Sequence, residues 1–208
     1  ALWSASGYIA AFMRASNVVH DVPEGRPLWK TLPVRVAVTL VLVILATLTV
    51  FAVIATGGLA ERGGELLGVG PTAVMVWDIA KWPVILIAVV FMIGLLYWAS
   101  PNARRGLRWV GPGSLLAVVI WLIASGAFAV YVANFASYNE TYGSMATVII
   151  FLVWLWISNI AILLGAEFNA EIERARAADA GQSVSEEPYV ELRDVPKKNK
   201  KKSREGSG

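Results

Sequence analysis

Small and polar side chains recur along the last apolar stretch of the chain, Tyr142–Gly165, and continue to Glu171. At about 100° per residue, they fall on one face of a helix. On a membrane helix such a face contacts other protein, because small residues let backbones approach and polar groups need partners. This polar stripe could line a substrate path or serve helix packing alone, and packing is the default expectation. Its candidate residues are Ser144, Thr147, Ser158, Asn159 and Asn169. A ridge of small residues on the preceding apolar stretch is expected to meet this face or to line the same interior space: Ser125, Ala129, Ala133 and Ser137.

Two carboxylates, Glu167 and Glu171, stand one turn apart at the end of the same stretch, on a neighbouring face. An ionisable group at membrane depth is a functional candidate by default. At the membrane interface, pairing with Arg174, Arg176 or the 104–108 loop is the simpler alternative. We keep both residues as candidate ionisable groups at the cytoplasmic end, with interfacial pairing as the expected role.

A short polar turn, Asn134–Ser144, joins the last two apolar stretches. Its side chains could bind a polar ligand on the outer side of the membrane. They could equally cap the two helices and anchor them at the interface, which we favour. The candidates in this outer polar turn are Asn134, Tyr138, Asn139 and Tyr142.

Other chemistry finds little support in the residue types. The chain has no cysteine and one histidine, His20, which excludes thiolate sites and histidine clusters within it. Nucleotide-binding glycine loops, zinc spacings and a serine–histidine–acid set are also lacking. We therefore predict no catalytic residue, no metal and no cofactor, and a protein that is not an enzyme.

The elements that carry these residues are membrane helices. The chain is 57% hydrophobic and 16% charged, whereas soluble domains carry about 25% charged residues. Four stretches approach or exceed the roughly 20 apolar residues that cross a bilayer, and hydrocarbon forces each to be helical. The prediction is an all-α polytopic membrane protein with a helical domain over residues 1–176 and spans at about 34–56, 83–100, 114–136 and 142–165.

Residues 1–22 are also apolar but carry Ser4, Ser6, Gly7 and Arg14. They could be the end of a further membrane helix followed by an interfacial helix, which we favour, or a single interfacial helix. The chain does not begin with Met, and its first residues resemble the interior of an apolar segment. We therefore expect the natural N-terminus to be missing.

Tryptophans mark the expected depth of the helices. Several lie near span ends, where amphipathic rings favour the headgroup region: Trp29, Trp77, Trp82, Trp98 and Trp109. Three lie deeper and are expected to pack between helices: Trp121, Trp154 and Trp156.

Lysine and arginine in the short loops predict that the C-terminus is cytoplasmic. Residues 177–208 are polar and charged, so we expect a disordered cytoplasmic tail. Its run Lys197–Lys202 could contact anionic lipid, although a solvated basic tail is the simpler expectation. The expected partner is the lipid bilayer. A homo-oligomer is an open alternative to a monomer, and nucleic acid is not expected.

The stretches "ALWSASG" (Ala1–Gly7) and "YGSMATVIIFLVWLWISNIAILLGAEFNAE" (Tyr142–Glu171) resemble the YihY/BrkB family of bacterial inner-membrane proteins. Compatible features lie between them in "PEGRPLWK" (Pro23–Lys30) and "LYWASPNARRGLRWVGPGSLLA" (Leu96–Ala117). The resemblance implies about six membrane helices, so that one helix and part of another would precede Ala1. It also implies a location in the inner membrane. Family members have carried virulence-factor and ribonuclease labels, and no catalytic residues can be carried over.

Together these features favour a multi-pass inner-membrane transporter or exporter of an envelope lipid component or an ion. The alternative is a non-transporting scaffold or envelope-integrity factor of the virulence-associated kind. A ribonuclease is disfavoured, because the sequence offers one histidine, scattered carboxylates and no soluble domain to hold metal ions and RNA.

Overall fold

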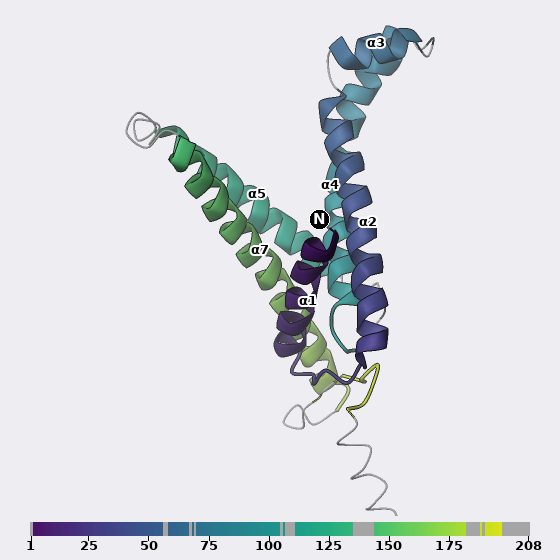
Figure 1. The fold of residues 1–208 in the computed structure, drawn as a ribbon, viewed down its shortest axis with the longest axis vertical. Helices are drawn as coiled ribbons and strands as arrows, with labels where there is room; N and C mark the ends of the chain where they lie inside the picture. The colour runs from purple at the N-terminus through teal and green to yellow at the C-terminus, as the bar shows by residue number, and fades with distance from the viewer. Residues whose placement is uncertain are drawn as a thin grey trace, which may run out of the picture.

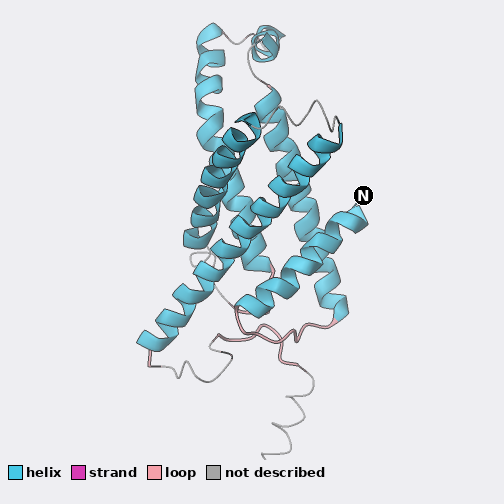
Figure 2. Ribbon diagram, turned by 90° about the vertical axis from the view of Figure 1, so that its left-hand side faces the viewer, coloured by secondary structure: helices cyan, strands magenta, loops and turns pink. Residues whose placement is uncertain are grey.

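The protein is seen in a computed structural model that describes residues 2–55, 58–66, 68, 70–104, 106, 111–134, 144–181, 188 and 190–196. Within these residues every regular element is a helix (Figures 1 and 2). The helices are α1 (Leu2–Val19), α2 (Leu28–Ile54), α3 (Gly58–Leu66), α4 (Pro71–Ala99), α5 (Gly111–Asn134) and α7 (Ser144–Asp179). The predicted all-α membrane class is confirmed.

Four helices are long and apolar enough to cross a membrane: α2, α4, α5 and α7. Only 11% of the most apolar window of each helix is buried inside the chain. Most of this apolar surface therefore faces outward, as expected for lipid-facing helices.

Two helices are much longer than the spans predicted for them. Helix α4 begins at Pro71, where a proline at the first helical position loses no hydrogen bond, and it continues through Pro83. Helix α7 continues to Asp179. Both therefore extend beyond the hydrocarbon, because the helical hydrogen-bond pattern does not stop where the apolar residues stop.

The long helices form two arms that converge at one end and diverge toward the other (Figure 1). The first arm is α2 packed against α4, and the second arm is α5 packed against α7. Helix α3 packs against α4 at the far end of the first arm. Helix α1 lies between the arms near their junction and contacts α2 and α7.

The core lies where the arms and α1 meet. Phe12 of α1 stacks on Tyr97 of α4, with ring centroids 6.2 Å apart. Tyr97 is 1% exposed, so this aromatic pair is the centre of the junction. The buried apolar cluster around it draws on α1, α2, α4, α5 and α7: Ile9, Phe12, Met13, Val38, Leu96, Tyr97, Ala99, Ala117 and Ala166.

The first 22 residues contain one helix rather than the two segments that we favoured. Helix α1 ends in a left-handed turn, with Asp21 at φ 50°. The amide of Asp21 donates to the Val18 carbonyl, and that of Val22 donates to the Asn17 carbonyl. This pair of hydrogen bonds is the Schellman arrangement that closes a helix C-terminus. The structure therefore has one helix here, and the interfacial position of the alternative stays a prediction.

The tail prediction needs correction at two places. Helix α7 extends to Asp179, past the expected start of disorder at residue 177. Residues 190–196 lie against the junction, where Leu192 forms an isolated antiparallel bridge with Ala103. Low apolar content suggested disorder, but hydrogen bonds from the junction hold this segment. The run Lys197–Lys202 lies outside the described residues.

Three tryptophans that were predicted to lie near the ends of the spans are exposed on the first arm. Trp29 lies near the junction and is 72% exposed, while Trp77 and Trp82 lie on the opposite part of the arm and are also exposed. Trp121 and Trp154 pack between α5 and α7, as expected. The same expectation was wrong for Trp156, which is 65% exposed, because it lies on the outward face of α7.

Candidate functional site

The side chain of Asn159 joins α7 to α1. The Tyr8 hydroxyl donates a hydrogen bond of 2.7 Å to the Asn159 Oδ1, and the Asn159 Nδ2 donates to the Leu155 carbonyl at 2.8 Å. Asn159 lies about four turns before Glu173 on α7, a helix long and apolar enough to cross a membrane. The predicted interhelical role of Asn159 therefore has a partner on α1 and not on α5.

On the opposite side of α1, Ser6 contacts the first arm. Arg35 of α2 donates to the Ser6 Oγ from its Nε at 3.2 Å and from its Nη2 at 2.9 Å. The Ser6 hydroxyl in turn donates to the Trp3 carbonyl at 2.8 Å. The Trp3 ring lies 5.2 Å from the Arg35 guanidinium carbon. Helix α1 thus makes polar contacts with both arms from positions only two residues apart.

The other inward residues of the stripe serve packing between α5 and α7. The Trp121 Nε1 donates to the Ser158 Oγ at 3.0 Å, and the Trp154 Nε1 donates to the Ser125 Oγ at 3.2 Å. Ser158 also donates to the Trp154 carbonyl at 2.8 Å. The predicted pairing of these two helices is confirmed, and their hydroxyl and indole groups bond to one another.

Asn169 lies at the tightest point of the same seam. It is fully buried, and its Oδ1 accepts a 2.8 Å hydrogen bond from the Gly113 amide. Gly165 lies one turn earlier, where an added Cβ would stand 2.5 Å from the Gly113 carbonyl oxygen and 2.6 Å from the Tyr97 hydroxyl. Tyr97 donates to the Ile162 carbonyl, which brings α4 into the contact. These contacts hold α4, α5 and α7 together at this point.

Thr147 and Asn134 lie away from these contacts. Both are exposed, and the Asn134 Nδ2 donates to the Val130 carbonyl of its own helix. The side chain of Ser144 and the turn residues Tyr138, Asn139 and Tyr142 lie outside the described residues. The proposed ligand-binding role of this outer turn stays a prediction.

The two candidate carboxylates, Glu167 and Glu171, have different surroundings in the structure. Glu167 is exposed. Glu171 forms an ion pair with Arg174 at 2.6 Å, and Arg174 also contacts Asp21 at 2.5 Å. Glu171 therefore pairs with one of the arginines that we expected, and its position at the interface stays a prediction.

A set of polar residues at the junction, three of them buried, was not predicted from the sequence. We call it the polar hub: Asn17, Glu24, Arg26, Asn102 and Asp194. Its centre is Asn102, which is fully buried, and its Nδ2 donates to the carbonyls of Pro23 at 2.9 Å and Asp194 at 2.8 Å. The hub connects the end of α1, the loop before α2, the end of α4 and residues 190–196.

Arg26 and Glu24 form the charged part of the hub. The Arg26 Nε and Nη2 donate to the two carboxylate oxygens of Glu24 at 2.9 Å and 2.8 Å. Arg26 also donates to the carbonyls of Ala99 and Ser100, which would otherwise be unpaired at the end of α4. Burial alone raises the pKa of Glu24, but the hydrogen bonds from Arg26 and Asn17 outweigh it and hold the pKa below its ordinary value.

The sequence "PEGRP" (Pro23–Pro27) could have predicted the Glu24–Arg26 part of the hub. An acid and a base that are two residues apart between prolines suggest a fixed turn. Gly25 allows the close approach of the C-terminal segment, because a Cβ there would overlap the Asp194 carbonyl. Nothing in the local sequence pointed to Asp194 as the partner, since it lies in the segment expected to be disordered.

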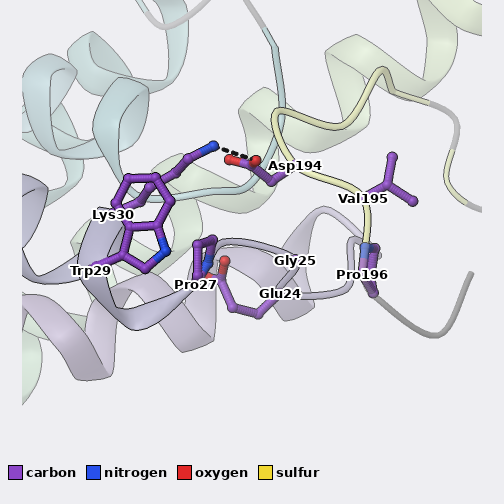
Figure 3. Close-up of a pocket in the computed structure, with 8 residues that line it drawn as sticks. All are labelled: Glu24, Gly25, Pro27, Trp29, Lys30, Asp194, Val195 and Pro196. Atoms are coloured by element: carbon purple, nitrogen blue, oxygen red, sulfur yellow. Dashed lines mark hydrogen bonds and ion pairs between the residues drawn. The ribbon is translucent and has the colours of Figure 1, made fainter. Parts of the chain in front are cut away.

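A pocket of about 490 Å³ adjoins the hub (Figure 3). Lys30 and Asp194 form a 2.6 Å ion pair on one side of it, and Trp29 stands beside Lys30. Its remaining lining comes from Glu24, Gly25, Pro27, Val195 and Pro196. Most of the charged groups in its lining already form ion pairs. The pocket is therefore a weaker candidate for a functional site than the polar contacts of α1 with the two arms.

The single histidine is also close to the hub. His20 is 1% exposed, its Nδ1 is 2.8 Å from the Ser16 carbonyl, and its Nε2 is 3.9 Å from a Glu173 carboxylate oxygen. Among the described residues, no three His, Cys, Asp or Glu side chains lie close enough to hold a metal ion.

Comparison with known proteins gives the family. The family "Virulence factor BrkB" matches residues 1–188. The ribonuclease-like protein YfkH of Bacillus subtilis is 30% identical over 176 residues, which is 85% of this chain and 64% of that protein. UPF0761 membrane proteins of Alkalilimnicola ehrlichii and Pseudoalteromonas translucida are 42% and 35% identical, over 43% and 49% of this chain.

The chain spans less than two thirds of the length of these relatives, with 21% and 32% of the two UPF0761 proteins covered. No solved structure matches the chain. The match over residues 1–188, together with four apolar helices of membrane-spanning length, shows that the chain belongs to the BrkB family of membrane proteins.

Proposed function

We propose that this BrkB-family protein transports a lipid component of the envelope across the bacterial inner membrane by relative movement of its two arms. The observation that carries the proposal is the double polar contact of α1. Ser6 bonds to Arg35 of the first arm, and Tyr8 bonds to Asn159 of the second arm. We place the C-terminus in the cytoplasm, as the loop charges favour.

The contrast between the two kinds of helix contact supports movement between the arms. The α5–α7 seam is closed by glycine at Gly113 and Gly165, where even a methyl group has no room. Such tightly packed helices move as one unit, and because Tyr97 of α4 packs on Gly165 at the junction, relative movement belongs to the parts of the arms that diverge beyond it. At Tyr8, the contact of α1 with α7 is instead a hydrogen bond, which contributes about 0.5–1.5 kcal/mol net and can be exchanged.

A lipid substrate agrees better than an ion with the surroundings of these contacts. Tyr8 is 45% exposed, and large apolar side chains of both arms are exposed to the membrane. Polar groups therefore lie beside surfaces that would hold acyl chains. Glu167, exposed near the cytoplasmic end of α7, remains a candidate ionisable group on the same route.

The ribonuclease-like name of YfkH gives the nuclease alternative little support in this chain. The carboxylates of Glu24, Asp78, Glu171, Glu191 and Asp194 pair with arginine or lysine, and no cluster of metal ligands lies within the described residues. Paired carboxylates are poorly placed to recruit the metal ions that RNA cleavage commonly uses.

Reconstitution of the full-length protein in liposomes tests the proposal. Fluorescent anionic phospholipid in one leaflet should reach the other leaflet faster than in protein-free vesicles. Tyr8→Phe and Asn159→Leu should change the rate several-fold, while Thr147→Ala, on an exposed part of α7, should leave it unchanged. Equal rates with and without protein would refute transport and favour the scaffold alternative.

A further inference from the structure

We infer that Arg35, Ser6 and Trp3 form a binding site for the phosphate of an anionic lipid, between α1 and α2. As a statement about the transported substrate, this inference rests on the proposed function. As a binding site, it stands on the geometry of these three residues alone.

Among the described residues, no carboxylate forms an ion pair with Arg35. Five basic side chains form ion pairs with acids: Arg26 with Glu24, Lys30 with Asp194, Lys81 with Asp78, Arg104 with Glu191, and Arg174 with Asp21 and Glu171. Within the described residues, the polar and aromatic contacts of Arg35 are Ser6 and Trp3. A guanidinium stays charged at all ordinary pH values, so a counter-charge must come from outside the described chain.

The depth of Arg35 makes this counter-charge important. Arg35 lies in the candidate span α2, about 7.5 Å further along the helix axis than Lys30. Lys30 and the exposed Trp29 mark the interfacial level at this end. A partly buried arginine just inside that level is costly without an anion, and a lipid phosphate can reach it by a small inward displacement.

The hydrogen bonds around Arg35 leave one edge of the guanidinium for a ligand. Two of its five N–H groups, on Nε and Nη2, point at the single Ser6 oxygen. The Ser6 hydroxyl donates its own hydrogen bond to the Trp3 carbonyl, so the lone pairs of its oxygen can accept from Arg35. The Nη1 group and the second Nη2 hydrogen remain, which is the pattern that binds two phosphate oxygens together.

The surroundings of the site fit a lipid better than a free ion. The Trp3 side chain is 73% exposed and lies over the guanidinium carbon at 5.2 Å. Leu32 and Val36 of α2, on either side of Arg35 in the sequence, are 44% and 38% exposed. An acyl chain can lie along this apolar surface while its phosphate contacts Arg35.

Native mass spectrometry of the full-length protein in detergent tests the site. The probes are phosphatidylglycerol, phosphatidylcholine and inorganic phosphate, added separately and in competition. The wild type should retain one phosphatidylglycerol more tightly than phosphatidylcholine. Arg35→Gln should weaken this preference about ten-fold to a hundred-fold, the size of losing charge-assisted hydrogen bonds.

Matched variants separate the site from net charge and from folding. Arg14→Gln removes the same charge from the exposed face of α1 and should keep the wild-type preference. Ser6→Ala should weaken binding less than Arg35→Gln does. Arg35→Lys should give an intermediate preference for the anionic lipid, because it keeps the charge but loses the two-point contact with phosphate. The inference is overturned if Arg35→Gln binds phosphatidylglycerol like the wild type, or if Arg14→Gln loses it equally.

Two further outcomes are informative. Tight binding of inorganic phosphate without any preference for phosphatidylglycerol would overturn the lipid assignment. Phosphatidylglycerol that binds at Arg35 but is not translocated in liposomes would refute the transport function and leave the binding site intact.

Discussion

Asn102 and Asp194 exchange two hydrogen bonds across 92 residues of sequence. The Asp194 amide donates to the Asn102 Oδ1 at 3.0 Å, and the Asn102 Nδ2 donates to the Asp194 carbonyl at 2.8 Å. The Asn102 side chain thus takes the place of a neighbouring backbone strand. It ties the C-terminal segment to the loop that follows α4.

Asn102→Ala should therefore destabilise the protein strongly. It removes two donors and one acceptor from a fully buried site and leaves the carbonyls of Pro23 and Asp194 without this donor. We expect a loss of about 2–4 kcal/mol, since each buried unsatisfied group costs about 1–3 kcal/mol. Thermal unfolding in detergent measures it, with Asn134→Ala on an exposed helix end as the control. Equal midpoints for the two variants would contradict the central role of Asn102.

Gly165→Ala should destabilise the α5–α7 seam. The added Cβ would stand 2.6 Å from the Tyr97 hydroxyl and 2.7 Å from the Ala117 Cβ, and α4 and α5 must move to admit it. Overpacking of this kind costs about 1–3 kcal/mol. Gly126→Ala in α5 is the matched control, because nothing lies within 4 Å of its Cβ position. Its better helix propensity should leave stability unchanged or slightly higher, by up to about 1 kcal/mol. A similar loss in both variants would argue against the close contact at Gly165.

The Glu24–Arg26 pair should make stability depend on acid pH. The pKa of Glu24 is lower in the folded protein than in the unfolded chain. Its stabilising contribution is therefore complete above the unfolded pKa and is lost as the pH falls through the folded pKa. Glu24→Gln should be less stable than the wild type at neutral pH, and the difference should shrink in acid. Unfolding midpoints at a series of pH values measure this, with Glu167→Gln as the control, and a difference that grows in acid would contradict the assignment.

Cross-linking should distinguish movement between the arms from movement within one arm. Residues 1–208 contain no cysteine, so engineered pairs within them meet no native thiol of this part of the protein. A short thiol-reactive linker between Tyr8→Cys and Asn159→Cys should stop lipid translocation, because it fixes α1 to the second arm. The control pair Ser125→Cys and Ser158→Cys should tolerate the same linker, since α5 and α7 pack as one unit. The Tyr8–Asn159 variant is compared before and after linking, which separates the linker from the loss of the hydrogen bond. Translocation that continues in the linked pair would refute arm movement.

Much of the fold follows from the sequence, because hydrocarbon leaves an apolar segment few alternatives to a helix. The four long apolar stretches predicted α2, α4, α5 and α7, and the small residues of the last two predicted that these helices pair. The start of α4 at Pro71 was not predicted, whereas the predicted helical domain to residue 176 ends close to the observed end of α7 at Asp179. A helix continues into water as long as its residues tolerate helical geometry. Helix α4 therefore does not begin at Pro83, and α7 does not stop before Ala177.

The candidate site was only partly predictable. The stripe correctly singled out Ser158, Asn159 and Asn169 as residues that face other protein. It could not say that Ser158 and Asn169 bond within the α5–α7 seam while Asn159 reaches Tyr8. Helical periodicity gives the direction of a side chain but not the identity of the helix that it meets.

By itself, the sequence determined that this chain forms membrane helices, which of their faces are polar, and the family to which it is similar. The tertiary structure decided that α1 lies between two arms, that Arg35 meets Ser6 instead of a carboxylate, and that residues 190–196 dock on Asn102. These features depend on contacts between segments far apart in the chain. Local composition carries little information about such contacts, because each buried polar group needs a partner but does not specify where in the sequence that partner lies.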